Sequence, residues 1–142
     1  MTQYRNPLQE SVARAEGLLD HIGHVCDQYE LAIEQRRVAL DAYQEAKESY
    51  EQMESETVVD IMFEDARYSA AKNAEARKAV LDVCLIEART KGRLANAWRA
   101  MNQAKSVLDN AEMAYAQMDA RFKAVRVAAE LSAGMLRASA LV

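Results

Sequence analysis

The apolar residues of this chain recur at alternating intervals of four and three over most of its length, which constrains the fold more than any other feature. In the first half the series runs Leu8, Val12, Ala15, Leu19, Ile22, Cys26, Tyr29, Ile33, Arg36, Leu40, Tyr43, Lys47 and Tyr50. All but Arg36 and Lys47 are apolar or aromatic. This spacing places the series on one face of an α-helix and is typical of a coiled-coil seam.

A second and longer series follows. It runs Ala76, Val80, Val83, Glu87, Thr90, Leu94, Ala97, Met101, Ala104, Leu108, Ala111, Tyr115, Met118, Phe122, Val125, Ala129, Ser132 and Leu136. The segment 54–72 between the two breaks the spacing. We therefore predict one all-α domain, 1–142, with a first long helix at 7–53, a connector or short helix at 54–72 and a second long helix at 73–137. It would fold as a long antiparallel helical hairpin or coiled coil within an oligomeric helical bundle.

Capping residues support these boundaries. A helix N-terminus is indicated at Asn6, which is followed by Pro7, and another at Asn73, which is followed two residues later by Glu75. Only 4 Gly and 1 Pro occur, which leaves little material for turns. We expect a kink or short break at residues 90–92, Thr-Lys-Gly.

Charge is distributed unevenly along the chain. Residues 1–66 carry 5 Lys or Arg against 15 Asp or Glu, whereas residues 67–142 carry 13 against 7. A basic segment for nucleic acid is one interpretation. Two helices of opposite charge lying side by side is the other, and we favour it.

The two predicted helices differ in length, at roughly 70 and 90 Å. The far end of the second seam would then have no partner within the chain, and an exposed apolar stripe marks an association surface. We predict a homo-oligomer, most simply a dimer, with its interface at Tyr115, Met118, Phe122, Val125, Ala129 and Leu136.

Basic residues are frequent around Trp98. The residues that could contact an anion or nucleic acid are Arg77, Arg89, Lys91, Arg93, Arg99 and Trp98. On a helical wheel the basic residues of this region spread around most of the circumference. Nucleic-acid binding is therefore the less favoured alternative, and Trp98 is expected to be a packing anchor.

No catalytic or metal-binding pattern emerges. His21, His24 and Cys26 with neighbouring acids look like metal ligands, but the heptad directs both histidines outward and Cys26 inward. The chain has no Gly-rich phosphate loop and no nucleophile elbow. We expect no metal, no cofactor and no enzymatic activity.

The sequence indicates a cytoplasmic protein. It has no apolar run long enough to span a membrane. The start, MTQYRNPLQE, has no apolar segment typical of a secretory signal. Cys26 and Cys84 are expected to be reduced core residues.

The stretch from Lys72 to Ala79, K-N-A-E-A-R-K-A, opens the second helix, and 122–126, F-K-A-V-R, lies near its end. Together they resemble small phage and prophage helical accessory proteins over roughly residues 67–130. Ala71 stands where such proteins often have Gly before the Lys. The resemblance implies an accessory protein of a mobile element acting in a bacterial host cell. Such a protein could be encoded beside recombination functions or could inhibit host defence. In that setting Asn73 and Arg77 would contact a phosphate or a partner carboxylate, although a cap and a surface Arg is the simpler interpretation.

We therefore expect a non-catalytic helical protein that binds a host or phage protein. The alternatives are a nucleic-acid-binding accessory of recombination or replication, a nucleotide-sequestering sponge, and a virion assembly component.

Overall fold

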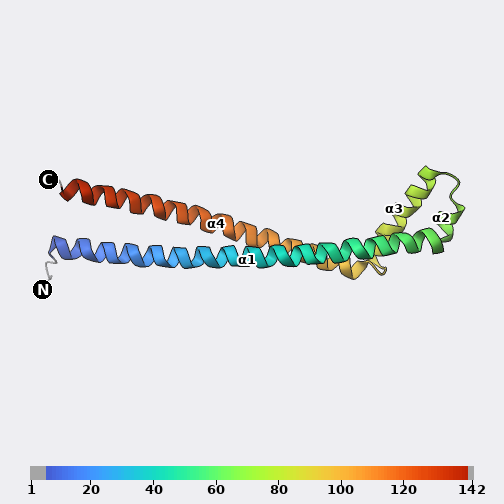
Figure 1. Ribbon diagram of the computed structural model, residues 1–142, viewed down its shortest axis with the longest axis horizontal. Helices are drawn as coiled ribbons and strands as arrows, with labels where there is room; N and C mark the ends of the chain where they lie inside the picture. The colour runs from blue at the N-terminus through green and yellow to red at the C-terminus, as the bar shows by residue number, and fades with distance from the viewer. Residues whose placement is uncertain (1–5, 141–142) are drawn as a thin grey trace. The chain divides into compact units, whose positions relative to one another are not determined.

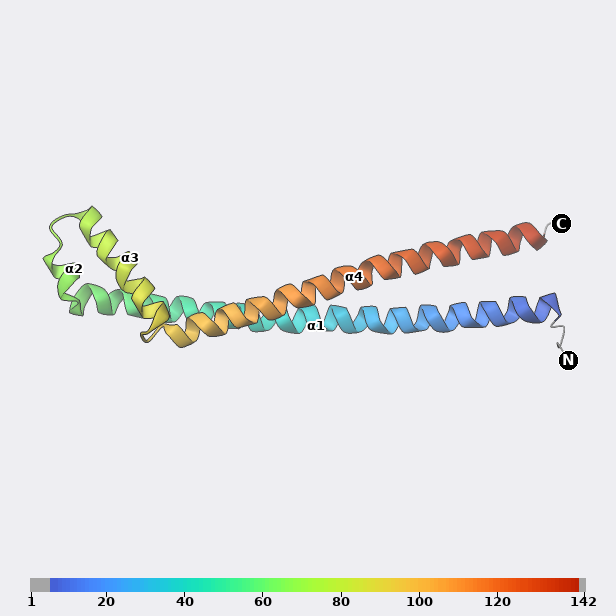
Figure 2. The same ribbon diagram turned by 180° about the vertical axis from the view of Figure 1, so that it is seen from behind.

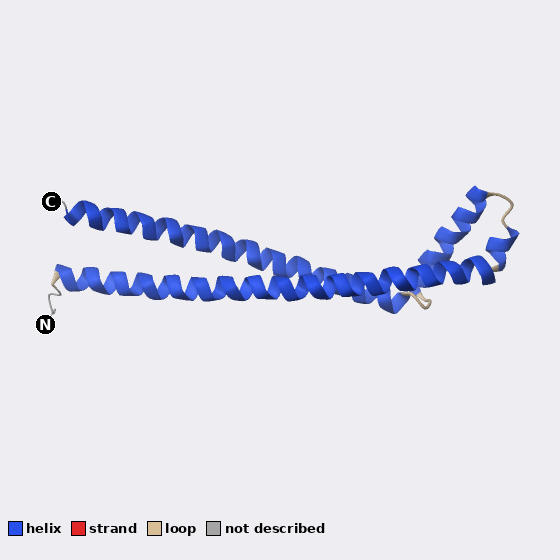
Figure 3. Cartoon of the chain, viewed as in Figure 1, coloured by secondary structure: helices blue, strands red, loops and turns tan. Residues whose placement is uncertain are grey.

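The computed structural model describes residues 6–140, apart from the side chains of residues 136, 139 and 140. Over this range it contains the helices α1 (Pro7–Glu64), α2 (Ala66–Ala70), α3 (Ala74–Thr90) and α4 (Ala95–Ala140), and no strand (Figure 3). The predicted all-α class is confirmed. The chain divides into two compact units: unit 1 joins the part up to Arg36 with the part from Ala111 onward, and unit 2 is Arg37–Asn110. No helix in the described range is long and apolar enough to cross a membrane.

Both predicted N-caps are confirmed. The Asn6 side-chain oxygen accepts a hydrogen bond from the backbone N–H of Leu8 at 3.3 Å, and that of Asn73 accepts from the N–H of Ala76 at 2.8 Å. Each cap satisfies one of the N–H groups that a helix start leaves without a partner.

The expected break in the second helix is real. The helix predicted at 73–137 is two helices, α3 and α4, separated by residues 91–94. The Gly92 N–H donates to the Ala88 carbonyl at 3.2 Å, and a Cβ on Gly92 would lie 2.8 Å from the Ala88 Cα. Only glycine allows the backbone to approach that closely.

The first helix is longer than predicted. It continues past residue 53 to Glu64, because residues 54–64 contain neither Gly nor Pro. Asp65 then caps the short helix α2, accepting from the Arg67 N–H at 2.8 Å. The predicted connector at 54–72 is therefore reduced to Asp65, the five residues of α2 and the turn before Asn73.

In unit 1, α1 and α4 run antiparallel, because Arg36 lies over the Tyr115 ring while Tyr29, one heptad earlier, reaches Phe122. The Tyr29 ring stacks on Phe122 at 5.0 Å and on Tyr115 at 5.8 Å. Toward residues 7 and 140 the two helices diverge in both views (Figures 1 and 2).

The predicted seam of α4 is correct from Leu94 to Ser132, since every predicted position there is buried or half-buried. The predicted seam of α1 is only half correct. Ile22, Tyr29, Tyr43 and Tyr50 face inward as expected, but the positions that alternate with them are one residue off. Val25, Ala32 and Ala39 are buried, whereas Leu19, Ile33 and Leu40 are exposed. The apolar stripe of α1 is wider than one partner helix covers, and small residues allow the closer approach.

The predicted seam of α3 is also wrong in part. Val83, Glu87 and Thr90 are exposed, while Cys84 is buried. In unit 2 the C-terminal part of α3 contacts α1 through Arg89, which reaches Tyr50 and Glu54, and the other end of α3 leaves α1 at an angle (Figure 2). Leu94 is fully buried in the break between α3 and α4.

Candidate protein-interaction site

Unit 2 uses two of the predicted anion-binding residues to join its own helices. The Arg89 guanidinium donates to the Tyr50 hydroxyl at 2.7 Å and to a Glu54 carboxylate oxygen at 3.3 Å. It also lies 5.1 Å from the centre of the Trp98 ring, which packs against Tyr50 at 5.3 Å. Burial lowers the pKa of Arg89, but the contacts with Tyr50 and Glu54 outweigh it, so the net pKa is raised and the group stays charged. Trp98 is a packing anchor, as predicted.

Arg93 is also paired within unit 2. Its guanidinium lies 3.0 Å from an Asp60 oxygen and 3.6 Å from a Glu56 oxygen on α1. These contacts, with that of Arg89 to Glu54, agree within unit 2 with the interpretation that segments of opposite charge lie side by side. Arg77, Lys91 and Arg99 are exposed, so the six predicted residues do not form one site.

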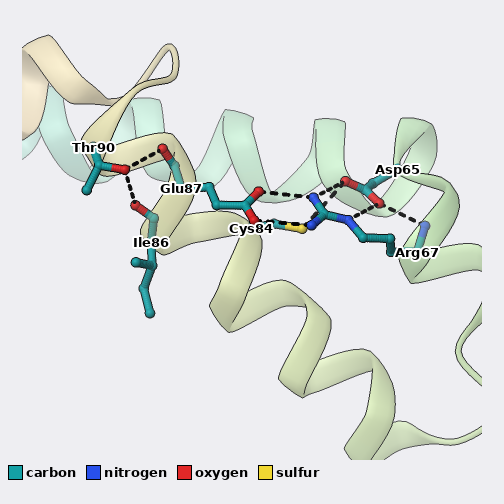
Figure 4. Close-up of polar contacts among 6 residues, drawn as sticks. All are labelled: Asp65, Arg67, Cys84, Ile86, Glu87 and Thr90. Atoms are coloured by element: carbon teal, nitrogen blue, oxygen red, sulfur yellow. Dashed lines mark hydrogen bonds and ion pairs between the residues drawn. The ribbon is translucent and has the colours of Figure 1, made fainter.

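A separate network joins α2 to α3 (Figure 4). Arg67 contacts Asp65 and Glu87 at 3.1 Å each, and the Cys84 thiol donates to Asp65 at 3.5 Å. The Arg67 contacts lower the pKa of Asp65 to about 2 and also lower the pKa of Glu87. Burial, followed by the hydrogen bond to Asp65, raises the pKa of the Cys84 thiol. This cysteine is therefore a poor nucleophile at neutral pH.

The residues predicted for the oligomer interface lie in unit 1. Tyr115 and Phe122 contact Tyr29, and Met118, Val125 and Ala129 are half-buried. The prediction that this stretch has no partner within the chain is wrong, because α4 is shorter than the helix predicted from the sequence. The Leu136 side chain lies outside the described residues.

Tyr29 also makes polar contacts with α4 within unit 1. Its hydroxyl donates to Asp119 at 3.0 Å and lies 3.3 Å from the Tyr115 hydroxyl. Asp119 in turn pairs with Lys123 at 2.8 Å. Hydrogen bonds to Tyr115 and Asp119 raise the pKa of Tyr29. Because a polar contact inside a seam fixes which residues face each other, this cluster sets the register of unit 1.

The histidine segment shows no converging ligands. His21 and His24 are exposed and Cys26 is half-buried. Over the described part of the chain, no group of three His, Cys, Asp or Glu side chains could hold a metal ion.

The sequence did not reveal the apolar surface at the end of α1, which we call the α1 tip: Val59, Met62 and Phe63. All three are exposed, and Phe63 is 83% exposed. Three- and four-residue steps put them on one face of the last turns. The apolar residues within 58–63 were the available signal, but the segment 54–72 breaks the heptad spacing, so the sequence does not show which of them face outward.

The grooves near this end are shallow and are bordered by charged side chains. One of about 300 Å³ is lined by Thr57, Ile61, Arg93 and the acids Asp60, Glu64 and Asp65. Arg93 and Asp60 contact each other across it, and Asp65 contacts Arg67 beside it. Such a groove can accept a side chain of a partner but does not enclose a small molecule.

Comparison with known proteins finds no matching family model, no matching curated protein and no matching solved structure.

Proposed function

We propose that this protein is a non-catalytic helical interaction protein whose unit 2 binds another protein through the α1 tip. The observation that carries the proposal is an aromatic ring and two aliphatic side chains, Phe63, Met62 and Val59, exposed together at the end of a helix. Large exposed apolar side chains, aromatic ones above all, mark binding surfaces.

The chemistry of the partner follows from the surroundings of the tip. Glu56, Asp60 and Glu64 lie on the same helical turns. Arg93 contacts the first two, but Glu56 and Glu64 remain exposed and Asp60 is half-buried. A helix with an apolar face and acidic edges fits an apolar groove bordered by Lys or Arg. The motif at Lys72–Ala79, which resembles that of phage and prophage accessory proteins, supports a host or phage protein as partner, with host-defence inhibition as one outcome of that binding.

We propose a non-catalytic protein because the thiol and the carboxylates with shifted pKa values are engaged in contacts within the chain. The Cys84 thiol has a raised pKa, and the carboxylates with lowered pKa values pair with Arg67 or Lys123. None of these groups is left poised as a general base beside a nucleophile.

Site-specific photo-crosslinking in the bacterial host tests the proposal. A photoreactive residue at position 63 should capture one protein, and capture should be lost when Val59→Glu and Met62→Glu are added. The matched control carries the photoreactive residue at Gly17, on the outer face of α1 in unit 1, and should not capture that protein. Equal capture from positions 63 and 17, or capture that survives the two glutamates, would contradict the proposal.

Nucleic-acid binding is the alternative function, and it needs a separate test. Arg77, Lys91 and Arg99 remain exposed, whereas Arg89 and Arg93 contact carboxylates. We expect no shift of single- or double-stranded DNA or RNA at low salt, where phosphate contacts are strongest. A salt-dependent shift that Arg77→Ala, Lys91→Ala and Arg99→Ala together abolish would favour the nucleic-acid function instead.

A further inference from the structure

Unit 1 leaves a row of apolar residues on α1 beside its own seam. Val12, Leu19, Cys26 and Ile33 follow one another at intervals of seven and flank the buried column of the helix. Leu19 is 67% exposed and Ile33 is 44% exposed. An α-helix that packs on a single neighbour needs only a narrow apolar stripe, whereas one in a larger bundle carries an additional flanking row. We call these four residues the α1 row.

The end of α4 carries a second apolar face as well, which we call the α4 face. It consists of residues that are exposed and uncharged: Ala120, Ala124, Val127, Ala128, Leu131, Gly134, Met135 and Ala138. A groove of about 430 Å³ runs along it, lined in part by Val127, Leu131, Gly134 and Met135. The inner seam of the same helix, including Phe122 and Val125, already faces α1. This stretch of α4 is therefore apolar on two sides, and only one is covered within unit 1.

Two helical glycines lie on these apolar surfaces, where they would allow another backbone to approach closely. Gly23 lies between Leu19 and Cys26 on the side of the α1 row, and Gly134 lies in the α4 face. A Cβ on either would meet nothing within 4 Å. Glycine weakens a helix interior, and no contact within the chain requires it at these two positions. A close helix–helix approach from outside is a physical reason for it.

Charge selects the pairing. Glu16, Asp20 and Asp27 border the α1 row, while Arg121 and Arg137 border the α4 face. Glu130 also lines the groove of the α4 face, but its carboxylate is paired with Arg126 of the same helix at 3.7 Å. An α1 row against another α1 row would bring like charges together, whereas α1 against α4 brings opposite charges together.

We infer that a second copy of this chain docks on unit 1, with the α1 row of each copy packed against the α4 face of the other. Each contact is about 30 Å long for a row of this length. Two such contacts, each about 10 Å across, remove on the order of 1,200 Å² of surface from water, which is enough for a specific dimer. The surface is distinct from the α1 tip, which belongs to unit 2.

Glycine substitutions test the interface by sedimentation velocity over a concentration series of the full chain. Gly23→Ala and Gly134→Ala should hold or raise helix content, because an added methyl meets open space within the chain. Each should nevertheless weaken dimerisation at least about tenfold, since the methyl overpacks a close contact. The matched control is Gly17→Ala. Gly17 also has open space but lies on the opposite side of α1 from Leu19, and its substitution should leave the dimer unchanged. A wild-type chain that stays monomeric at tens of micromolar, or equal effects at all three glycines, would overturn the inference.

Charge exchange tests which faces meet. One variant carries Asp20→Lys and Asp27→Lys, and the other carries Arg121→Glu and Arg137→Glu. No ion pair within the described residues involves these four side chains. Each variant alone should dimerise more weakly than the wild type, and mixing the two should restore association, because the mixed dimer regains opposite charges at both contacts. If the Lys variant alone dimerises as well as the wild type, α1 does not face α4 of the second copy.

Discussion

In unit 1 the helices meet through rings and aliphatic groups, with Tyr29 stacked on Tyr115 and Phe122. In unit 2 ion pairs between guanidinium groups and carboxylates join the segments. Arg67 of α2 contacts Glu87 of α3, and Arg89 and Arg93 contact carboxylates of α1. Unit 2 thus uses its opposite charges internally and leaves a small apolar tip. Unit 1 uses one face of each helix and leaves a second. The same heptad pattern yields a nearly self-sufficient unit in one region and an incomplete one in the other.

The largest expected effect is on the core of unit 2. Leu94→Ala removes a fully buried side chain from the break between α3 and α4. It should lower the free energy of unfolding by about 3 kcal/mol, because the lost burial and the remaining cavity both count. Urea unfolding measures this. Leu31→Ala, on the exposed side of α1, is the control and should change stability by less than about 0.5 kcal/mol. Equal effects at the two leucines would show that Leu94 is not a core residue.

Next in size is the polar anchor of unit 2. Tyr50→Phe leaves the ring against Trp98 but removes the acceptor for Arg89. Unfolding free energy should fall by about 1 kcal/mol, as is usual for one hydrogen bond. Tyr43→Phe is the matched control, since Tyr43 is half-buried in the same unit and no hydrogen bond to it is seen among the described residues. A Tyr50 effect no larger than the Tyr43 effect would remove the polar anchor from the account.

The stability of the protein at alkaline pH should depend on Tyr29 of unit 1. Its pKa is raised above 10.0, chiefly by hydrogen bonds to Tyr115 and Asp119. Below pH about 10 the folded and unfolded chains are both protonated there. At higher pH the unfolded chain ionises first, so stability is lost as pH rises. Tyr29→Phe should flatten that loss in thermal unfolding above pH about 10. An unchanged slope would contradict the hydrogen bonds of Tyr29.

The smallest effect concerns the α2 cap. The pKa of Asp65 is about 2 in the folded chain, against an ordinary 3.8, because of its contacts with Arg67. Stability from this carboxylate is present above pH about 4 and is lost as the pH falls toward 2. Asp65→Asn should reduce the acid sensitivity of thermal unfolding in that window. If wild type and variant lose stability in parallel there, Asp65 is not held ionised by Arg67.

Periodicity predicted the helical class and the second seam from Leu94 to Ser132, while the residue types at Asn6, Asn73 and 90–92 predicted the two N-caps and the break near Gly92. Periodicity failed where the apolar stripe was too wide to choose one register. On α1 the spacing assigned the larger Leu19, Ile33 and Leu40 to the seam. The residues that are buried are instead Val25, Ala32 and Ala39. Composition cannot show which small residues a neighbouring helix will approach.

The prediction that the far end of the second seam has no partner within the chain failed for a related reason. Helix lengths were estimated without knowing that α1 reaches Glu64 or that the second helix breaks, so Tyr115 and Phe122 were left without a partner in the prediction. The roles of Arg89 and Arg93 were missed in the same way, because a basic residue is assigned to a carboxylate only when the facing helix is known.

Concentration-dependent hydrogen exchange tests the contrast between the units most directly. At concentrations that populate the dimer, backbone amides of 7–36 and 111–140 should exchange more slowly than in dilute protein, while amides of 37–110 should exchange at the same rates. Exchange independent of concentration in unit 1, or slowing confined to unit 2, would contradict the account.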